Sequence, residues 1–120
     1  MLTAWQINRG RMEGLKRGDV VWVNLDPTVG GEIRKRRPCV VVSLSVLNEK
    51  RLTVVVVPLS TASTPRPPLV VAVPSAGPAS NARIDQIRAV DKSRILNVAG
   101  KLNRSDLVQV EQGLRAVLGL

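Results

Sequence analysis

The feature that most constrains this chain is a set of short, valine-rich runs, each bounded by glycine, proline or polar residues. Two examples are CVVV at 39–42 and TVVVV at 53–57. β-Branched side chains lose rotamer freedom in a helix, but they pack well on a pleated, half-buried surface. The runs are also too short to cross a bilayer. The pattern therefore predicts a mainly β fold made of several short strands.

Valine-rich runs, together with alternating side chains in the first and the fifth segment, predict five strands between glycine-, proline- or serine-rich breaks. They cover about 19–25, 37–45, 52–59, 69–74 and 82–91, with a turn or single helical turn at 46–51. The C-terminus changes to a helical period, in which Leu107, Val110 and Leu114 recur on one face. Asn103 or Ser105 can cap this helix. We expect a small, curled antiparallel sheet or barrel closed by a C-terminal helix, an α+β arrangement dominated by strands.

At 120 residues the chain has the length of one domain. Residues 1–14 show no clear periodicity, and we expect them to form a flexible N-terminal tail before a domain at 15–120. They lack the apolar core of a signal peptide. The lone cysteine, Cys39, falls inside a strand pattern, which predicts a buried, inert thiol in a reducing compartment. These features favour a cytoplasmic protein.

Three residue types are missing, and their absence excludes several kinds of site. The chain has no His, Tyr or Phe. Zinc sites with histidine ligands and Ser-His-Asp or Cys-His catalysis are therefore excluded. Base stacking on aromatic rings could use only Trp5 and Trp22. The net charge of +9 nevertheless points to a polyanionic partner, which could be nucleic acid, an anionic membrane surface or an acidic protein.

The positive charge is concentrated in GGEIRKRRP at 30–38, directly before a predicted strand. This segment holds Glu32 and four consecutive cations, Arg34, Lys35, Arg36 and Arg37. Arg37 falls where the loop meets the strand, so its backbone is anchored while its guanidinium can reach a phosphate. The alternative is a solvated loop in which Glu32 pairs with Arg34 or Arg36. Taken alone, the segment favours generic anion binding over catalysis.

Two further polar clusters accompany this loop. Ser60 and Thr61 end the third predicted strand, where their hydroxyls could bind a phosphate oxygen or simply satisfy a local turn. In NARIDQIR, Arg83 and Asp85 are expected on one face of the fifth strand, with Gln86 on the other. They form either an exposed ion pair or a phosphate donor beside a carboxylate.

These three clusters, in this order, resemble the MazF/PemK family, the toxin half of bacterial toxin–antitoxin pairs. The resemblance spans 15–120 and rests on four stretches: KRGDVVWVNLDPTVGGEIRKRRPCVVVS, VVVPLST, RIDQIRAVDKSRI and a C-terminal helix ending in VLGL. It implies a small SH3-like β-barrel with a C-terminal helix that forms a homodimer. It also implies an endoribonuclease that needs no metal or other cofactor and cuts single-stranded RNA at short sequences.

The resemblance also implies roles for particular residues. Attack of the RNA 2′-hydroxyl on the adjacent phosphorus would give a 2′,3′-cyclic phosphate and a 5′-hydroxyl. The family's motifs map its glutamate and catalytic arginine onto Glu32 and Arg37, and its catalytic hydroxyl onto Ser60, where many relatives carry threonine. Some members use an Arg-x-Asp pair, which maps to Arg83 and Asp85. Those members also place a histidine where this chain has Gly31.

Such a reaction needs a base, a clamp for the phosphorane and an acid. Without histidine, the base would be Glu32 or Asp85. Arg37 remains protonated and suits the clamp better than the acid. Ser60 would hold a phosphate oxygen. The RNA-binding surface would add six further side chains: Thr61, Arg34, Lys35, Arg36, Gln86 and Arg66.

Two other functional classes remain open from the sequence. A non-catalytic barrel that binds nucleic acid would explain the charge but leave Glu32, Arg37 and Asp85 without a use. A protein-interaction role is compatible with the enzyme, because a basic groove should attract an antitoxin with an acidic, disordered segment that folds on binding.

Overall fold

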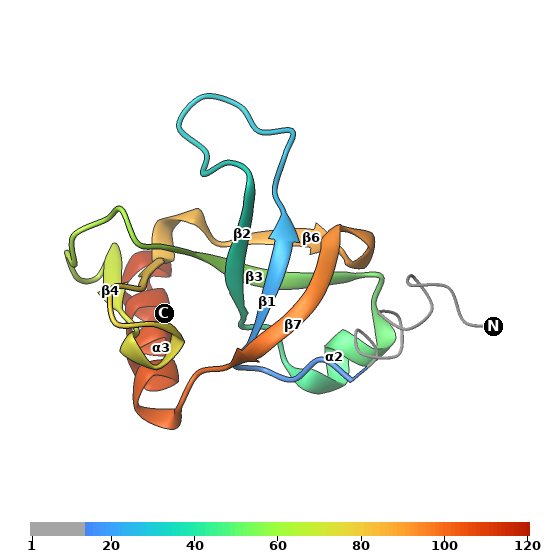
Figure 1. Ribbon diagram of the computed structural model, residues 1–120. Helices are drawn as coiled ribbons and strands as arrows, with labels where there is room; N and C mark the ends of the chain where they lie inside the picture. Colours follow the sequence, from blue (N-terminus) through green and yellow to red (C-terminus); the bar gives the residue numbers. More distant parts are fainter. Residues whose placement is uncertain (1–13) are drawn as a thin grey trace.

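The computed structural model describes residues 14–120, and the predicted N-terminal tail lies almost entirely outside them (Figure 1). The elements follow one another as β1 (Asp19–Asn24), β2 (Arg36–Val41), α2 (Ser45–Lys50), β3 (Thr53–Ser60), β4 (Val70–Ala72), η1 (Pro74–Ala76), β5 (Asn81–Arg83), η2 (Ile84–Gln86), β6 (Arg88–Asp91), η3 (Lys92–Arg94), β7 (Ile95–Lys101) and α3 (Arg104–Leu118). The η elements are single 3₁₀ turns.

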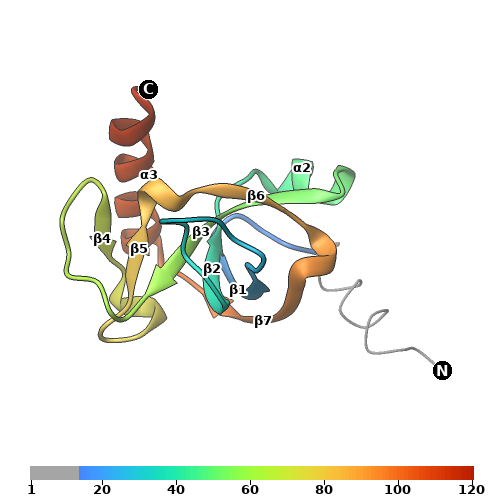
Figure 2. The same cartoon turned by 90° about the horizontal axis from the view of Figure 1, so that it is seen from above.

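All seven strands join one antiparallel sheet. Its order is β4-β5-β3-β2-β1-β7, and β6 pairs with β3 beside this path. Figure 2 shows from above how the sheet curls round. The expected mainly β fold with a C-terminal helix is confirmed. The hydrogen-bonded ladder stays open, however, because the terminal strands β4 and β7 do not pair with each other within the described residues.

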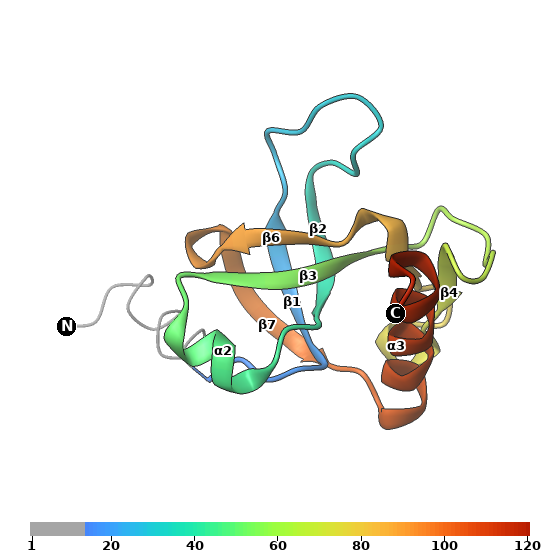
Figure 3. The same cartoon turned by 180° about the vertical axis from the view of Figure 1, so that it is seen from behind.

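Alternating valines bury both faces of this curled sheet. In β1, Val20 joins one apolar cluster, while Val21 and Val23 join the other. The same alternation runs through β2 and β3, as expected for a strand whose successive side chains point to opposite faces. Figure 3 shows α2 and α3 at opposite sides of the molecule. The first cluster is extended by Val110 and Leu114 of α3. Both valine runs are thus core, as the sequence predicted.

Cys39 is fully buried in β2, which confirms the expected structural role for this thiol. Burial raises its pKa to about 12, although the nearby charges of Arg88 and Arg37 act in the opposite direction. The nucleophilic thiolate is therefore essentially absent at neutral pH.

The prediction of one continuous strand at 82–91 is wrong for its central residues. The chain leaves the sheet at Ile84–Gln86 to form η2, and only Asn81–Arg83 and Arg88–Asp91 are strands. Asp85 is therefore in a 3₁₀ turn, and it does not share a strand face with Arg83. The buried side chain of Ile84 turns into the core against α3, which takes this segment out of the ladder.

The approach of α3 to η2 depends on Gly113. A Cβ at this position would lie 3.1 Å from Cγ1 of Ile84 and 3.2 Å from the carbonyl oxygen of Pro68. Glycine in a helix interior costs up to ~1 kcal/mol relative to alanine. Here that cost is offset by close packing, which fixes the turn that carries Asp85 and Gln86.

The helix α3 begins and ends as its sequence predicts. The side chain of Asn103 caps it by accepting a hydrogen bond from the Asp106 amide at 2.8 Å, so Asn103 and not Ser105 is the N-cap. Gly119 ends it in the left-handed conformation, with φ of 73°. The strand β7 was not predicted, because only Ile95 of its seven residues is buried and its second half, from Ala99 to Lys101, is exposed.

Candidate active site

The long loop between β1 and β2, residues 25–35, rises above the sheet and carries the predicted basic segment (Figure 1). Its two ends are joined by a backbone hydrogen bond from Leu25 N to Lys35 O at 3.0 Å. The carboxylate of Asp26 accepts a second bond from the Lys35 amide at 3.2 Å. Lys35 has a φ of 74°, the left-handed conformation that lets the chain turn back into β2.

Two arginines from later in the chain hold the β1 side of this loop. Arg88 Nη1 donates to the carbonyl oxygen of Leu25 at 3.3 Å. Arg94 Nη1 donates to the carbonyl oxygens of Asn24 and Asp26 at 3.2 and 2.7 Å. Sequence reasoning missed both, since an arginine that binds backbone looks the same in the sequence as one that binds a ligand. The base of the loop is therefore held in a fixed conformation by these two side chains.

Glu32 is oriented by its own loop. Its Oε1 accepts a hydrogen bond from the Val29 amide at 2.5 Å, and its amide donates to the Val29 carbonyl oxygen at 3.2 Å. In the described part of the chain it makes no ion pair with Arg34 or Arg36. The neighbouring Ile33 amide donates to Oε1 of Gln86 at 3.1 Å. Gln86, predicted to bind RNA, thus ties the loop to η2.

Arg37 and Ser60 are brought together in one pocket. Arg37 lies opposite Val23 in the β1–β2 register, and its Nε donates to the Arg34 carbonyl oxygen at 2.7 Å. A pocket of about 360 Å³ is lined by its side chain and by Ser60, Thr61 and the partly exposed ring of Trp22, among others. With Arg36 and Ser80 also in its lining, this pocket combines two cations with three hydroxyl residues, which suits a phosphate group.

The hydroxyl of Ser60 is nearly buried, with 6% of the residue exposed. Its Oγ accepts a hydrogen bond from the Ala62 amide at 3.1 Å. This is the local turn interaction that the sequence offered as the alternative to phosphate binding. A hydroxyl that accepts in this way still has its hydrogen to donate. The turn orients Ser60 and leaves it able to bind an anionic oxygen.

The remaining predicted residues line two other pockets that meet at Asp85. One, of about 460 Å³, is bounded by Glu32, Asp85, Gln86 and Arg88. The other, of about 410 Å³, is bounded by Arg66, Arg83 and Asp85 together with the 63–65 segment, Leu69 and Val70. The structure therefore separates Arg83 and Asp85 from the pocket that holds Arg37 and Ser60.

The loop that follows Ser60 is held by Asn81, which the sequence did not single out. Its buried Nδ2 donates to the carbonyl oxygen of Ser63 at 2.6 Å and to that of Ala79 at 3.3 Å. The predicted RNA-binding residues Thr61 and Arg66 lie exposed on this loop. Arg34, Lys35 and Arg36 are likewise exposed on the other loop. The cations are thus available on the surface around the pockets.

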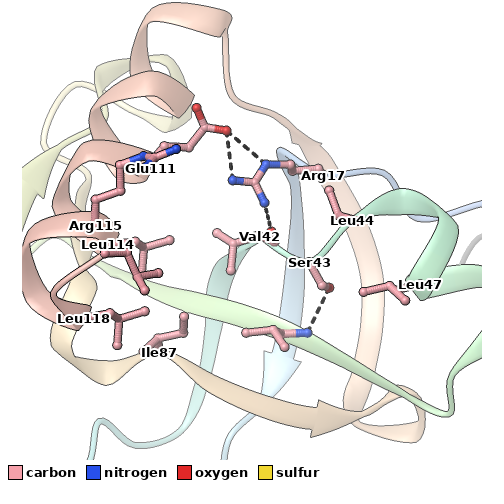
Figure 4. A pocket seen from close by; sticks show the side chains of 12 residues that line it. Arg17, Val42, Ser43, Leu44, Leu47, Ile87, Glu111, Leu114, Arg115 and Leu118 are labelled. Atoms are coloured by element: carbon pink, nitrogen blue, oxygen red, sulfur yellow. Dashed lines mark hydrogen bonds and ion pairs between the residues drawn. The ribbon is translucent and has the colours of Figure 1, made fainter.

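An apolar groove lies elsewhere, between α2 and the C-terminal half of α3 (Figure 4). Leu44, Leu47 and Leu118 line it, and about half of each side chain is exposed. At its rim, Arg17 Nη2 forms an ion pair with Glu111 Oε2 at 2.9 Å. A second N–H of Arg17 donates to the carbonyl oxygen of Val42. Exposed leucines gathered in a groove are typical of a protein-contact surface.

Residues 14–120 contain neither a cluster of metal-ligating side chains nor a helix that could span a membrane. No group of three or more Cys, Asp or Glu side chains is placed to hold a metal ion. No helix there is long and apolar enough to span a membrane.

Residues 16–118 match the family model described as PemK-like, MazF-like toxin of type II toxin-antitoxin system. Endoribonuclease MazF9 of Mycobacterium tuberculosis is 29% identical over 115 residues, which are 88% of this chain and 98% of that protein. A crystal structure of MazF from Deinococcus radiodurans superposes with a TM-score of 0.79 at 26% identity, covering 88% of this chain and 97% of that one. A MazE-MazF structure from the same organism has a TM-score of 0.72 at 25% identity, covering 89% and 98%.

Proposed function

The chain belongs to the PemK-like, MazF-like toxin family of type II toxin–antitoxin systems, and we propose from this premise that it is an endoribonuclease that cleaves single-stranded RNA at short sequences. The observation that carries the proposal is the pocket in which Arg37 meets the hydroxyls of Ser60 and Thr61. Fixed cations and hydroxyls are the groups that bind the oxygens of a phosphodiester.

The proposed reaction uses the RNA's own 2′-hydroxyl as nucleophile. A bond forms between O2′ and phosphorus while the bond between phosphorus and O5′ breaks. The products are a 2′,3′-cyclic phosphate and a 5′-hydroxyl, and no metal ion takes part. Arg37 stabilises the charge of the phosphorane, and Ser60 donates to one of its oxygens. A preorganised donor of this kind is worth about 3 kcal/mol of transition-state stabilisation.

The proton of the 2′-hydroxyl passes to a carboxylate in this scheme, and we assign that role to Glu32. It is oriented by Val29, and it stands on the loop that leads directly into Arg37. The leaving O5′ takes its proton from water or from Arg37. Glu32 and Asp85 both line a pocket other than the one that holds Arg37, and Glu32 is assigned the base because its loop leads directly into Arg37. Arg83 lines a further pocket with Asp85, and we assign both residues a role in substrate binding.

A non-catalytic, RNA-binding barrel is the second candidate. It is favoured by Ser60 at the position where many relatives carry threonine and by the lack of a side chain at Gly31. Incubation of internally labelled RNA with the protein and excess EDTA, followed by analysis of the ends that cleavage creates on both fragments, separates the two candidates. Fragments ending in a 2′,3′-cyclic phosphate support the enzyme. Retardation of intact RNA on a gel supports the binder, and fragments bearing 5′-monophosphates contradict the proposed chemistry.

We assign two protein partners to the chain. The apolar groove between α2 and α3 fits a second copy of this chain, because a homodimer would cover Leu44, Leu47 and Leu118. The net charge of +9 fits an antitoxin with an acidic, disordered segment. This segment folds onto the basic loops and prevents RNA from binding there. We place the protein in the cytoplasm, where both RNA and reduced thiols are found. Analytical sedimentation tests the homodimer. Inhibition of RNA cleavage by the product of the adjacent reading frame tests the antitoxin.

A further inference from the structure

The pocket that holds Arg83 has no part in the proposed cleavage chemistry. It is bounded on one side by the 63–66 segment and on the other by β4 and η2, and it encloses about 410 Å³. Leu69 and Val70 give it an apolar wall, and Arg66 and Asp85 stand at its exposed rim. This combination of an apolar wall with a few charged groups is typical of a small-molecule or nucleobase site.

The guanidinium of Arg83 is held in place but only partly used. Its Nη1 donates to Ser63 Oγ at 3.3 Å, a long hydrogen bond. Its Nε is buried and has no hydrogen-bond partner in the described structure. A buried donor left unpaired is costly, and such groups are concentrated at functional sites. Nη2 of Arg83 makes no hydrogen bond or ion pair among residues 14–120, so this end of the guanidinium is the part that a ligand in the pocket can reach.

The carboxylate of Asp85 lines the same pocket, yet it does not pair with Arg83. No ion pair within 4.0 Å joins the two residues, and no side-chain hydrogen bond of Asp85 occurs among residues 14–120. Both residues nevertheless line the same pocket, which therefore has one hydrogen-bond donor side chain and one acceptor side chain in its wall.

A phosphate group fits this pair poorly, since Asp85 would repel it. A nucleobase fits well, because each base edge combines hydrogen-bond acceptors with donors. Unpaired bases in single-stranded RNA expose these edges and stack on arginine planes or apolar side chains. In this chain, which has no Tyr or Phe, Arg66 and Leu69 can supply that stacking surface.

Guanine matches the two surfaces better than the other bases. It is the only base with two adjacent N–H donors, N1–H and the N2 amine, which a carboxylate can accept together. It also has two neighbouring acceptors, O6 and N7, which an arginine can bind as a fork. We propose that the Arg83–Asp85 pocket binds one guanine of the RNA, with Asp85 accepting from N1 and N2 and Arg83 donating to O6 and N7.

This inference rests on the proposed function, because it names the base that the RNA substrate presents to a second pocket. Its test measures binding without cleavage. Fluorescently labelled 2′-deoxyuridine oligonucleotides carry one central guanine, hypoxanthine, adenine or cytosine and are titrated with the full chain in EDTA. Hypoxanthine lacks only the N2 amine. We expect the guanine oligonucleotide to bind about tenfold more tightly than the hypoxanthine one, from the discrimination typical of a bidentate base contact.

Asp85→Asn should remove the difference between guanine and hypoxanthine. Asp85 is exposed and makes no internal contact that folding requires. Glu49→Gln, on the exposed surface of α2, removes the same charge and should keep the full preference. Equal affinity of the wild-type protein for guanine and hypoxanthine overturns the inference, as does an undiminished preference in Asp85→Asn. A guanine preference without any RNA cleavage would instead overturn the proposed enzyme and leave this pocket standing.

Discussion

Arg37 donates its Nε hydrogen to the carbonyl oxygen of Arg34, 2.7 Å away, where the β1–β2 loop enters β2. This bond fixes the guanidinium plane at the start of β2, and among residues 14–120 no hydrogen bond or ion pair engages either Nη group. The backbone of Arg37 is itself held in register opposite Val23, one of the fully buried valines. The proposed phosphorane clamp is therefore anchored at both ends, by the sheet and by the loop.

Arg37→Ala should abolish cleavage while the fold stays intact. Loss of one preorganised donor costs about 10²–10³ in kcat. The side chain is only partly buried and has no role in either apolar cluster. Rates on labelled single-stranded RNA, with circular dichroism as the folding check, measure the effect. Arg51→Ala, at the C-cap of α2, is the matched control. A wild-type rate for Arg37→Ala would remove this residue from the mechanism.

RNA in which the nucleotide before the scissile bond is 2′-deoxy should bind but resist cleavage, because it lacks the nucleophile. Binding of either strand should weaken with salt, with a log–log slope near −0.7 for each phosphate contacted. Anisotropy titrations at several salt concentrations and product gels measure the two effects. Cutting at the deoxy position would rule out attack by the 2′-hydroxyl.

Gln86→Ala should reduce cleavage by loosening the loop that carries Glu32. The substitution leaves the Ile33 amide without its acceptor at Oε1. We expect faster hydrogen exchange at Ile33 and a lower kcat, with little change in the free energy of unfolding. Gln112→Ala, exposed on α3, should change neither. If the exchange rate at Ile33 stays as in the wild type, the tether is not what positions this loop.

Asn103→Ala should lower the free energy of unfolding by about 1 kcal/mol, the usual contribution of an N-cap side chain. Asn103 Oδ1 is the acceptor for the Asp106 amide at the first turn of α3. Ser105→Ala is the control, since Ser105 makes no capping bond, and it should be nearly neutral. Urea unfolding of the three proteins measures the difference. The opposite order would mean that the cap has been assigned to the wrong residue.

Cys39 should resist alkylation at pH 8 unless the protein unfolds, because burial raises the pKa of its thiol to about 12. The pKa is higher in the folded state than the reference value of 9.0, so the neutral thiol is favoured by folding. Stability from this group is therefore complete below about pH 9 and is lost as the pH rises toward 12. Labelling rates across a urea series, and pH-dependent stability compared with Cys39→Ala, check both statements. Rapid labelling of the native protein would show that the thiol is accessible.

The sequence determined those parts of the fold that depend on local pattern. Valine-rich runs placed β1, β2 and β3, because β-branched side chains suit a strand and a short apolar run between breaks is typical of a buried one. Helical spacing, with a cap at Asn103 and a glycine at 119, placed α3. Three short stretches identified the family without long-range information: one holds Glu32 and Arg37, the second holds Ser60, and the third holds Arg83 and Asp85. The exposed edge strand β7 left no such pattern.

Only the tertiary structure decided which of those residues meet. Gly113 lets α3 approach η2, and that contact takes Asp85 off the strand on which the sequence had placed it. Arg88 and Arg94 turned out to hold backbone carbonyls, while Arg83 faces a pocket. In each case the side chain's role follows from packing between segments far apart in the chain, and the local sequence does not encode that packing.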